Sequence, residues 1–196
     1  MSLDEWLAWE YEGGLTEWVD GEAYVYMSNT AEHQRIVGFL SRLLGLWCEW
    51  RAAGTVMTAP YAMLSRSGRA GREPDVMFIS REHRERVQSL HLLGAPDLIV
   101  EVVSDDSVTR DLTTKLIEYQ AAGVAEYWIV DSRPGHQQAQ FFVLDGPRYR
   151  EVEDGEDGVY RSATVLGFWL DTAWLWDEEP RALVAFEAIR ASASTT

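Results

Sequence analysis

The segment Leu98–Val103 constrains the fold of this chain more than any other, because it is apolar at every position except Glu101. A near-continuous apolar run of this length is typical of a central strand that is covered on both faces. An ionised carboxylate inside such a strand costs several kcal/mol unless it is paired, hydrogen-bonded or bound to a metal ion. We therefore expect a sheet with helices on both faces, and a partner for Glu101.

The surrounding patterns predict a mixed α/β domain around that strand. An alternating segment with Asp20-Gly21 at its centre predicts a β-hairpin over residues 17–27. A long helix should begin at Asn29 or Thr30 and end near Ala53. Further predicted elements are strands at 55–64, 74–79, 125–130 and 139–144, a helix from Ser107 or Thr109 to Ala122, short strands at 148–153 and 158–164, and a C-terminal helix at 180–191.

Composition limits the classes of function. A chain of 196 residues suits one domain, and its net charge of −15 counts against tight, nonspecific DNA binding, which usually relies on a basic face. The single cysteine, Cys48, permits no internal disulfide. No apolar stretch approaches the length of a membrane span, and the N-terminus lacks the pattern of a secretion signal, so we expect a cytoplasmic protein without a membrane partner.

Lys115 is the only lysine among the 17 basic residues. Unlike the planar guanidinium of arginine, its amine is a compact point charge that can act as an acid, a base or a localised counter-charge. On the predicted helix, Lys115 lies about 60° from the centre of the apolar stripe, so its stem can follow the apolar surface while the ammonium approaches the strand. Asp111, one turn earlier, is an alternative partner.

Two carboxylates can converge with this amine. Asp75 follows Pro74 at the start of one predicted strand, and Glu101 lies within the next. Asp97 points to the same face as Glu101, but we interpret it as structural. Two strands and the following helix therefore predict a site with two acids and one amine at one edge of the sheet.

These residues resemble a known signature. Pro74-Asp75, Glu101 and Lys115 are similar to the PD-(D/E)XK nuclease pattern, and the wider sequence resembles the Uma-two group of bacterial restriction-endonuclease-like proteins. The resemblance spans roughly residues 15–185. It depends on the segments 73–76, 95–104 and 123–131, Arg110-Asp111, Lys115 with Tyr119, and the upstream 17–21 and Glu32-His33.

The resemblance implies a restriction-endonuclease-like α/β fold with a mixed central sheet flanked by helices. It implies one domain over 1–196, with an N-terminal helix and hairpin at 1–28, a nuclease-like core at about 29–145, and C-terminal strands and a helix at 146–196. The chain departs from the pattern at Val103, where the superfamily places its lysine. The resemblance implies that Lys115 on the next helix replaces it.

The resemblance also implies a metal-dependent mechanism. Asp75, Glu101 and the backbone carbonyl of Val102 would bind Mg²⁺ or Mn²⁺, which are hard cations that prefer oxygen ligands. Lys115 would orient or deprotonate the attacking water, or offset charge in the transition state. Secondary candidates for a ligand or a contact bordering the site are Glu17, Glu32 and His33.

Three classes of function remain open at this point. The first is an endonuclease that hydrolyses DNA, expected to be a homodimer, with Trp169, Trp174 and Trp176 as a candidate dimer surface. A basic loop is predicted at 65–72, whose Arg66, Arg69 and Arg72 either contact phosphate or belong to an ordinary solvated loop. The second is a catalytically inactive nuclease-fold protein with a binding or regulatory role, which the acidic charge favours. The third, ranked last, is a glycosidase-like hydrolase that uses Glu101 with a second acid.

Overall fold

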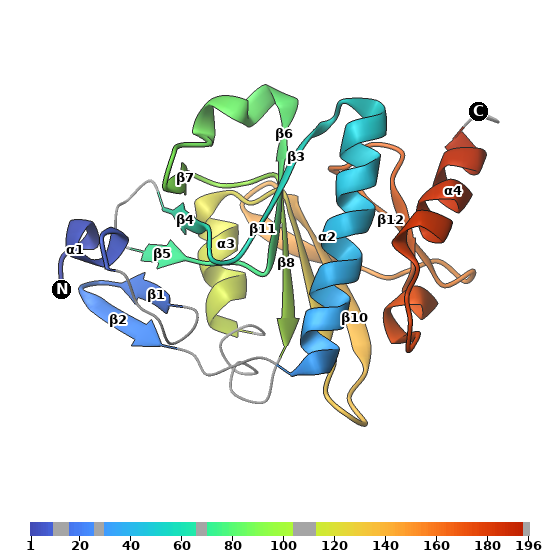
Figure 1. Ribbon diagram of the computed structural model, residues 1–196, viewed down its shortest axis with the longest axis horizontal. Coiled ribbons are helices and arrows are strands. Elements are labelled where there is room, and N and C mark those ends of the chain that lie inside the picture. The colour runs from blue at the N-terminus through green and yellow to red at the C-terminus, as the bar shows by residue number, and fades with distance from the viewer. Residues whose placement is uncertain (10–15, 26–29, 66–69, 104–112, 194–196) are drawn as a thin grey trace.

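A computed structural model describes residues 1–9, 16–25, 30–65, 70–103 and 113–193. Its largest element is a six-stranded sheet with the strand order β11-β10-β9-β8-β6-β3 (Figure 1). These strands are β3 (Gly54–Thr58), β6 (Val76–Ser80), β8 (Leu98–Val103), β9 (Glu126–Asp131), β10 (Gln138–Asp145) and β11 (Arg148–Val152). β8 pairs parallel with β9 and antiparallel with β6, so the sheet is mixed.

A helix covers each face of this sheet. The long helix α2 (Ala31–Arg51) packs on one face, where its buried side chains meet those of Val100 and Val102. The shorter α3 (Lys115–Ala122) packs on the other face, where Tyr119 lies among Ile99, Val103 and the inward side chains of β9. All six residues of β8 are buried, so the predicted central strand covered on both faces is confirmed.

A second, five-stranded sheet lies beside the first, with the order β2-β1-β5-β4-β7. Its strands are β1 (Thr16–Val19), β2 (Glu22–Val25), β4 (Ala62–Leu64), β5 (Ala70–Arg72) and β7 (His91–Leu93), and the short helix α1 (Leu3–Leu7) packs against it through Trp6. The predicted hairpin is confirmed: β1 and β2 are joined by Asp20 and Gly21, whose φ angles are 48° and 95°.

The C-terminal part completes the core on the α2 side. It contains the 3₁₀ helix η3 (Thr172–Trp176), the helix α4 (Ala182–Ala193) and a two-stranded sheet of β12 (Val159–Arg161) and β13 (Trp169–Asp171). A further 3₁₀ helix, η1 (Arg81–Arg86), follows β6. No helix in the described ranges is long and apolar enough to cross a bilayer.

Several predicted elements differ from the observed ones. The single strand expected at 55–64 is two strands, β3 and β4, which belong to different sheets because the chain turns at Pro60. α2 ends at Arg51, with Ala52 in the left-handed conformation, and Gly54 already belongs to β3. The loop expected at 65–72 ends in a strand, β5, whose last residue Arg72 is buried. The predicted start of the helix at Ser107 or Thr109 lies outside the described residues.

Candidate active site

Glu101 and Lys115 form a buried ion pair. The Nζ atom of Lys115 donates to Oε1 of Glu101 at 2.9 Å, and the hydroxyl of Tyr119 donates to the same oxygen at 2.6 Å. Lys115 and Tyr119 are four residues apart on α3 and therefore lie on the same side of the helix. The apolar strand thus supplies the carboxylate, and the helix above it supplies both of these donors.

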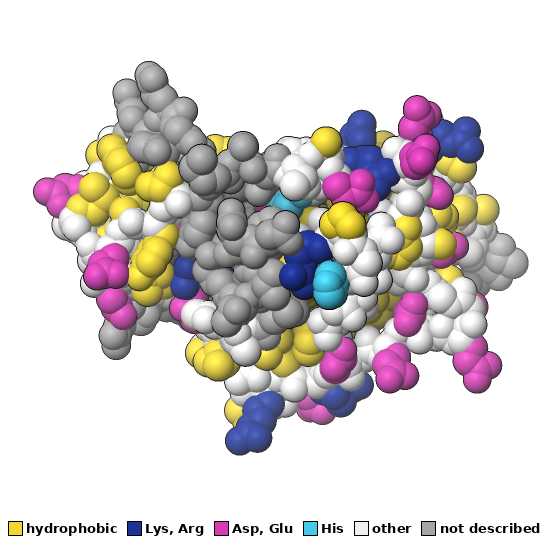
Figure 2. Space-filling model, turned by 90° about the horizontal axis from the view of Figure 1, so that it is seen from below, with side chains coloured by type: hydrophobic (Ala, Val, Ile, Leu, Met, Phe, Trp, Pro, Cys, Tyr) yellow, Lys and Arg dark blue, Asp and Glu magenta, His cyan; other side chains and the backbone are white. Residues whose placement is uncertain are grey.

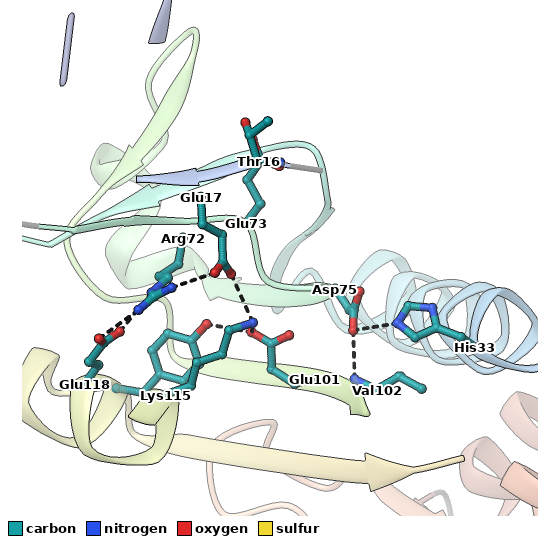
Figure 3. Close-up of polar contacts among 11 residues, drawn as sticks. Thr16, Glu17, His33, Arg72, Glu73, Asp75, Glu101, Val102, Lys115 and Glu118 are labelled. Atoms are coloured by element: carbon teal, nitrogen blue, oxygen red, sulfur yellow. Dashed lines mark hydrogen bonds and ion pairs between the residues drawn. The ribbon is translucent and has the colours of Figure 1, made fainter. Parts of the chain in front are cut away.

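The second sheet contributes the next contacts. Nζ of Lys115 also lies 3.1 Å from Oε1 of Glu17 on β1, and Oε2 of Glu17 accepts from Arg72 on β5 at 2.6 Å. Arg72 makes a two-pronged pair with Glu118 on α3, at 2.9 and 2.8 Å. Figure 3 shows these side chains pointing toward one another from the small sheet, the helix and β8. Lys115 is therefore held between carboxylates that belong to two different sheets.

Asp75 is held by a different pair of donors. Its Oδ2 lies 3.1 Å from Nε2 of His33 on α2 and accepts from the backbone N–H of Val102 at 2.8 Å. The antiparallel register of β6 and β8 pairs Val76 with Val100, so extending it by one residue places Asp75 opposite Glu101. The two acids therefore lie at the same end of neighbouring strands, as the sequence predicts.

Burial and nearby charge shift the pKa values of three groups around this cluster. Burial and the carboxylates of Glu101 and Glu17 raise the pKa of Tyr119 well above its usual value, so the phenol remains a proton donor at neutral pH. Burial, together with the charge of Glu17, raises the pKa of Glu73 to about 7. Burial alone would lower the pKa of Arg72, but its bond to Glu118 and the charges of Glu17 and Glu118 outweigh this and raise it.

The donor set fits a hydrated hard cation better than an ion enclosed by protein ligands. Within the described ranges, no group of three or more His, Cys, Asp or Glu side chains is arranged to hold a metal ion. Both bonds to Asp75 end on Oδ2, which leaves Oδ1 without a hydrogen-bond donor among the described residues. Mg²⁺ usually keeps several waters and needs only one or two carboxylates together with substrate phosphates. Asp75 and Glu101 match that requirement.

The predicted site residues divide into those that the fold brings together and those that it does not. Asp75, Glu101, Lys115, Glu17 and His33 all take part in the contacts described above. Glu32 instead pairs with Arg35, one turn along α2.

Val102 takes part through its N–H, whereas the carbonyl was the predicted ligand. Asp97 is structural, as predicted: it accepts from the N–H of Ser80 at 2.6 Å and bonds His83 at 2.7 Å.

Of the three arginines predicted at 65–72, only Arg72 lies among the described residues. Arg72 was expected in a loop that contacts phosphate, but it is 4% exposed and is fully engaged with Glu17 and Glu118. That expectation was wrong, because Arg72 belongs to β5, a strand of the second sheet, although the Gly- and Ser-rich sequence before it is typical of a loop. Arg66, Arg69 and Asp111 lie outside the described residues.

Sequence reasoning missed Glu118 and the hydroxyl of Tyr119. Both lie on α3 within four residues of Lys115. Their spacing of three and four residues from the unusual lysine was an available signal, since such residues share its side of the helix.

Comparisons with known proteins place this geometry in a family. A family model named Uma2, described as "Putative restriction endonuclease", matches residues 3–173. Among solved structures, the chain is similar to a "putative nuclease belonging to DUF820" from Anabaena variabilis, with a TM-score of 0.71 and 16% sequence identity over 89% of this chain and 99% of that one. At that identity the likeness shows a shared nuclease-like fold, the restriction-endonuclease-like α/β arrangement that the sequence predicted. No curated protein matches. Because the family model covers most of its length, the chain belongs to the Uma2 family.

Proposed function

We propose that this chain is an endonuclease that hydrolyses phosphodiester bonds of DNA with Mg²⁺ or Mn²⁺ at Asp75 and Glu101. The observation that carries the proposal is the buried Lys115 ammonium held against Glu101, which lies opposite Asp75 in the strand register. Oδ1 of Asp75 accepts no hydrogen bond from the described residues. A fold needs no buried lysine between two acids for stability alone, since apolar side chains of similar volume often serve as well. Membership of a nuclease-like family supports the same chemistry.

Each side chain has a role in this proposal. Asp75, oriented by His33 and the N–H of Val102, presents Oδ1 as a ligand. Glu101 presents a carboxylate whose position is fixed by Lys115 and Tyr119. A metal ion bound there would polarise a phosphate oxygen and lower the pKa of a bound water.

Of the roles that the sequence left open for Lys115, the contacts favour electrostatic stabilisation. Its amine is already engaged with two carboxylates, at 2.9 and 3.1 Å. A metal ion bound to Glu101 would compensate part of their negative charge, and the ammonium would then be a fixed positive charge beside the phosphate. Such a charge stabilises the negative charge that develops on the phosphate in the transition state. Glu17 then acts as a positioning residue, because it holds the amine from the opposite side.

The test combines DNA cleavage with metal binding. The purified chain should cleave plasmid or single-stranded DNA with Mg²⁺ or Mn²⁺, and Asp75→Asn should abolish cleavage and weaken Mn²⁺ binding measured by calorimetry. Asp97→Asn is the matched control, because Asp97 is also a buried aspartate but its side chain bonds only Ser80 and His83 in the described structure. The alternative, a nuclease-fold protein that binds without turnover, predicts no metal-dependent cleavage by the wild-type chain.

A further inference from the structure

A cavity of about 540 Å³ lies beside the candidate active site. Val103 lines it and directly follows Val102, whose N–H holds Asp75. Thr30 also lines it, and the Thr30 hydroxyl accepts from the N–H of His33, the partner of Asp75. The cavity and the candidate active site therefore share one strand end and one helix start.

Two arginines in the cavity wall are held rigidly and already neutralised. Arg133 donates to both oxygens of Asp131, at 2.9 and 2.7 Å, and Asp131 is 1% exposed. Arg35 pairs with Glu32 and donates to the backbone carbonyl of Asp177. Their planar groups are thus fixed in position, but they add no net positive charge to the cavity.

The charge of the wall argues against a phosphate as the occupant. Beyond the two ion pairs of Arg35 and Arg133, the wall carries one more carboxylate, that of Glu178. Phosphate recognition depends on uncompensated positive charge. Among the residues that Figure 2 colours by type at this end of the molecule, Lys and Arg side chains lie beside Asp and Glu side chains. The whole chain, at −15, adds no attraction of its own.

An uncharged, planar and polar ligand matches the remaining features. Trp176 and Pro134 give the cavity an aromatic and an apolar wall. Gln137 and Glu178 supply hydrogen-bonding groups, and both are exposed. A nucleobase has this combination of a flat apolar face and a polar edge, and aromatic side chains bind such faces by stacking.

We propose that this cavity takes up one unpaired nucleobase of the nucleic-acid strand, next to the phosphate that is cleaved. The inference rests on the proposed function, since the base belongs to the same substrate. Its face stacks on Trp176, and its edge bonds the polar side chains of the wall. Enzymes that act on nucleic acids often bind a base outside the helical stack, most easily in a strand that is already single. Stacking of a base supplies binding energy that does not depend on a basic surface.

The test compares Trp176→Leu with Trp174→Leu. Trp174 is the matched control: it belongs to the same 3₁₀ helix and is also partly buried, but it packs against Trp169, with ring centroids 5.2 Å apart, and does not line the cavity. Binding of a fluorescein-labelled single-stranded oligonucleotide is measured by anisotropy with Ca²⁺. Cleavage with Mn²⁺ is measured on the same oligonucleotide and on bis(p-nitrophenyl) phosphate, which has no nucleobase.

We expect Trp176→Leu to weaken oligonucleotide binding about 5- to 150-fold, the loss expected for one base–aromatic stack. Cleavage of the oligonucleotide should fall by a similar factor relative to bis(p-nitrophenyl) phosphate. Trp176→Phe, which keeps an aromatic face, should recover most of the binding. Trp174→Leu should leave the ratio of the two cleavage rates within about twofold of wild type.

Equal oligonucleotide binding by wild type and Trp176→Leu overturns the proposal, as does an absence of binding by the wild type. An equal loss on both substrates, without a loss of binding, also overturns it, because Trp176 would then support the fold of the site. Binding that depends on Trp176 without any cleavage by the wild type leaves the nucleobase cavity standing and removes the proposed hydrolysis. The two proposals therefore fail in different ways.

Discussion

Two buried glutamates on neighbouring strands, Glu101 on β8 and Glu126 on β9, are satisfied in opposite ways. Glu126 is fully buried and accepts four hydrogen bonds from uncharged donors. The donors are the side chains of Trp128, Tyr160 and Ser162 and the N–H of Thr164, at 2.7 to 2.8 Å. Glu101 instead faces the ammonium of Lys115 and the phenol of Tyr119, and both bonds end on Oε1.

The difference separates a structural carboxylate from a candidate reactive one. Each of the two oxygens of Glu126 accepts two hydrogen bonds. Three of these four bonds join β9 to residues 160–164, so the carboxylate stabilises the contact between β9 and the segment around β12. A satisfied network of this kind makes the local packing rigid. Glu101 is tied to a cation that is itself shared with Glu17 in the other sheet. Burial of a carboxylate is therefore a poor guide to function, and the charge and origin of its partners are more informative.

The largest effect should come from removing the amine. Lys115→Met leaves Glu101 and Glu17 facing each other without their cation, and losing one partner of a buried pair typically costs about 3 to 5 kcal/mol. We expect urea unfolding, followed by tryptophan fluorescence, to show a loss of that size. Arg161→Met is the matched control, because its pair with Asp157 is exposed and should be worth less than about 1 kcal/mol. If the two variants lost a similar free energy of unfolding, the buried Lys115 ion pairs would contribute no more to stability than an exposed ion pair.

The same isosteric change at the two glutamates should separate their roles. Glu101→Gln removes a charge that the proposed chemistry uses, so we expect metal-dependent DNA cleavage to fall at least about 100-fold, as when a key electrostatic group is removed. Initial rates are to be compared at equal concentrations of folded protein. Cleavage within a few-fold of wild type would exclude Glu101 from the reaction.

Glu126→Gln should affect stability alone. The NH₂ group of the glutamine would replace one carboxylate oxygen, and it cannot accept the two hydrogen bonds that this oxygen accepts. We expect the lost hydrogen bonds to cost about 1 to 3 kcal/mol. We expect a lower unfolding midpoint and an unchanged cleavage rate per folded molecule. A loss of cleavage by folded Glu126→Gln would erase the distinction between the two glutamates.

The smallest predicted effect is a pH dependence from Glu73, a carboxyl beside Glu17. Its pKa rises from 4.5 to about 7 on folding, so the folded chain binds more protons than the unfolded chain between these values. This contribution to stability is complete below about pH 4.5 and is lost as the pH rises through about 7. Allowing for partial exposure, we expect about 1 to 2 kcal/mol.

Unfolding of wild type and Glu73→Gln across this range measures that contribution as the difference between the two chains. The difference should change with pH in the stated direction. A constant difference would mean that Glu73 titrates at its ordinary pKa.

Much of the candidate site was predictable because its signals are local. Glu101 interrupts an apolar strand, and Lys115 lies on the helix that follows it, so the apolar run and the helix phase indicated that the two could meet. Asp75 was predictable for the same reason, since it directly precedes β6 (Val76–Ser80). The placement of helices on both faces of β8 followed from its apolar sequence.

The contacts that the sequence did not predict join segments that are distant along the chain. Arg72 lies in a segment whose composition is typical of a loop, yet it pairs with β1 and joins the network through Glu17 and Glu118. The role of Glu126 depends on Tyr160 and Ser162, more than 30 residues away. Local periodicity carries no information about such pairings, which depend on how the second sheet and the C-terminal segment dock.

The shared position of Lys115 has a consequence for folding. The large sheet supplies one acid for the amine, and the small sheet supplies the other, so neither sheet alone fixes the nitrogen. The small sheet contacts α3 through the two hydrogen bonds that Arg72 donates to Glu118. During folding, the chain therefore acquires the proposed reactive geometry only when the two sheets join, and a molecule that has opened between them would lack one of the two acids that hold the amine.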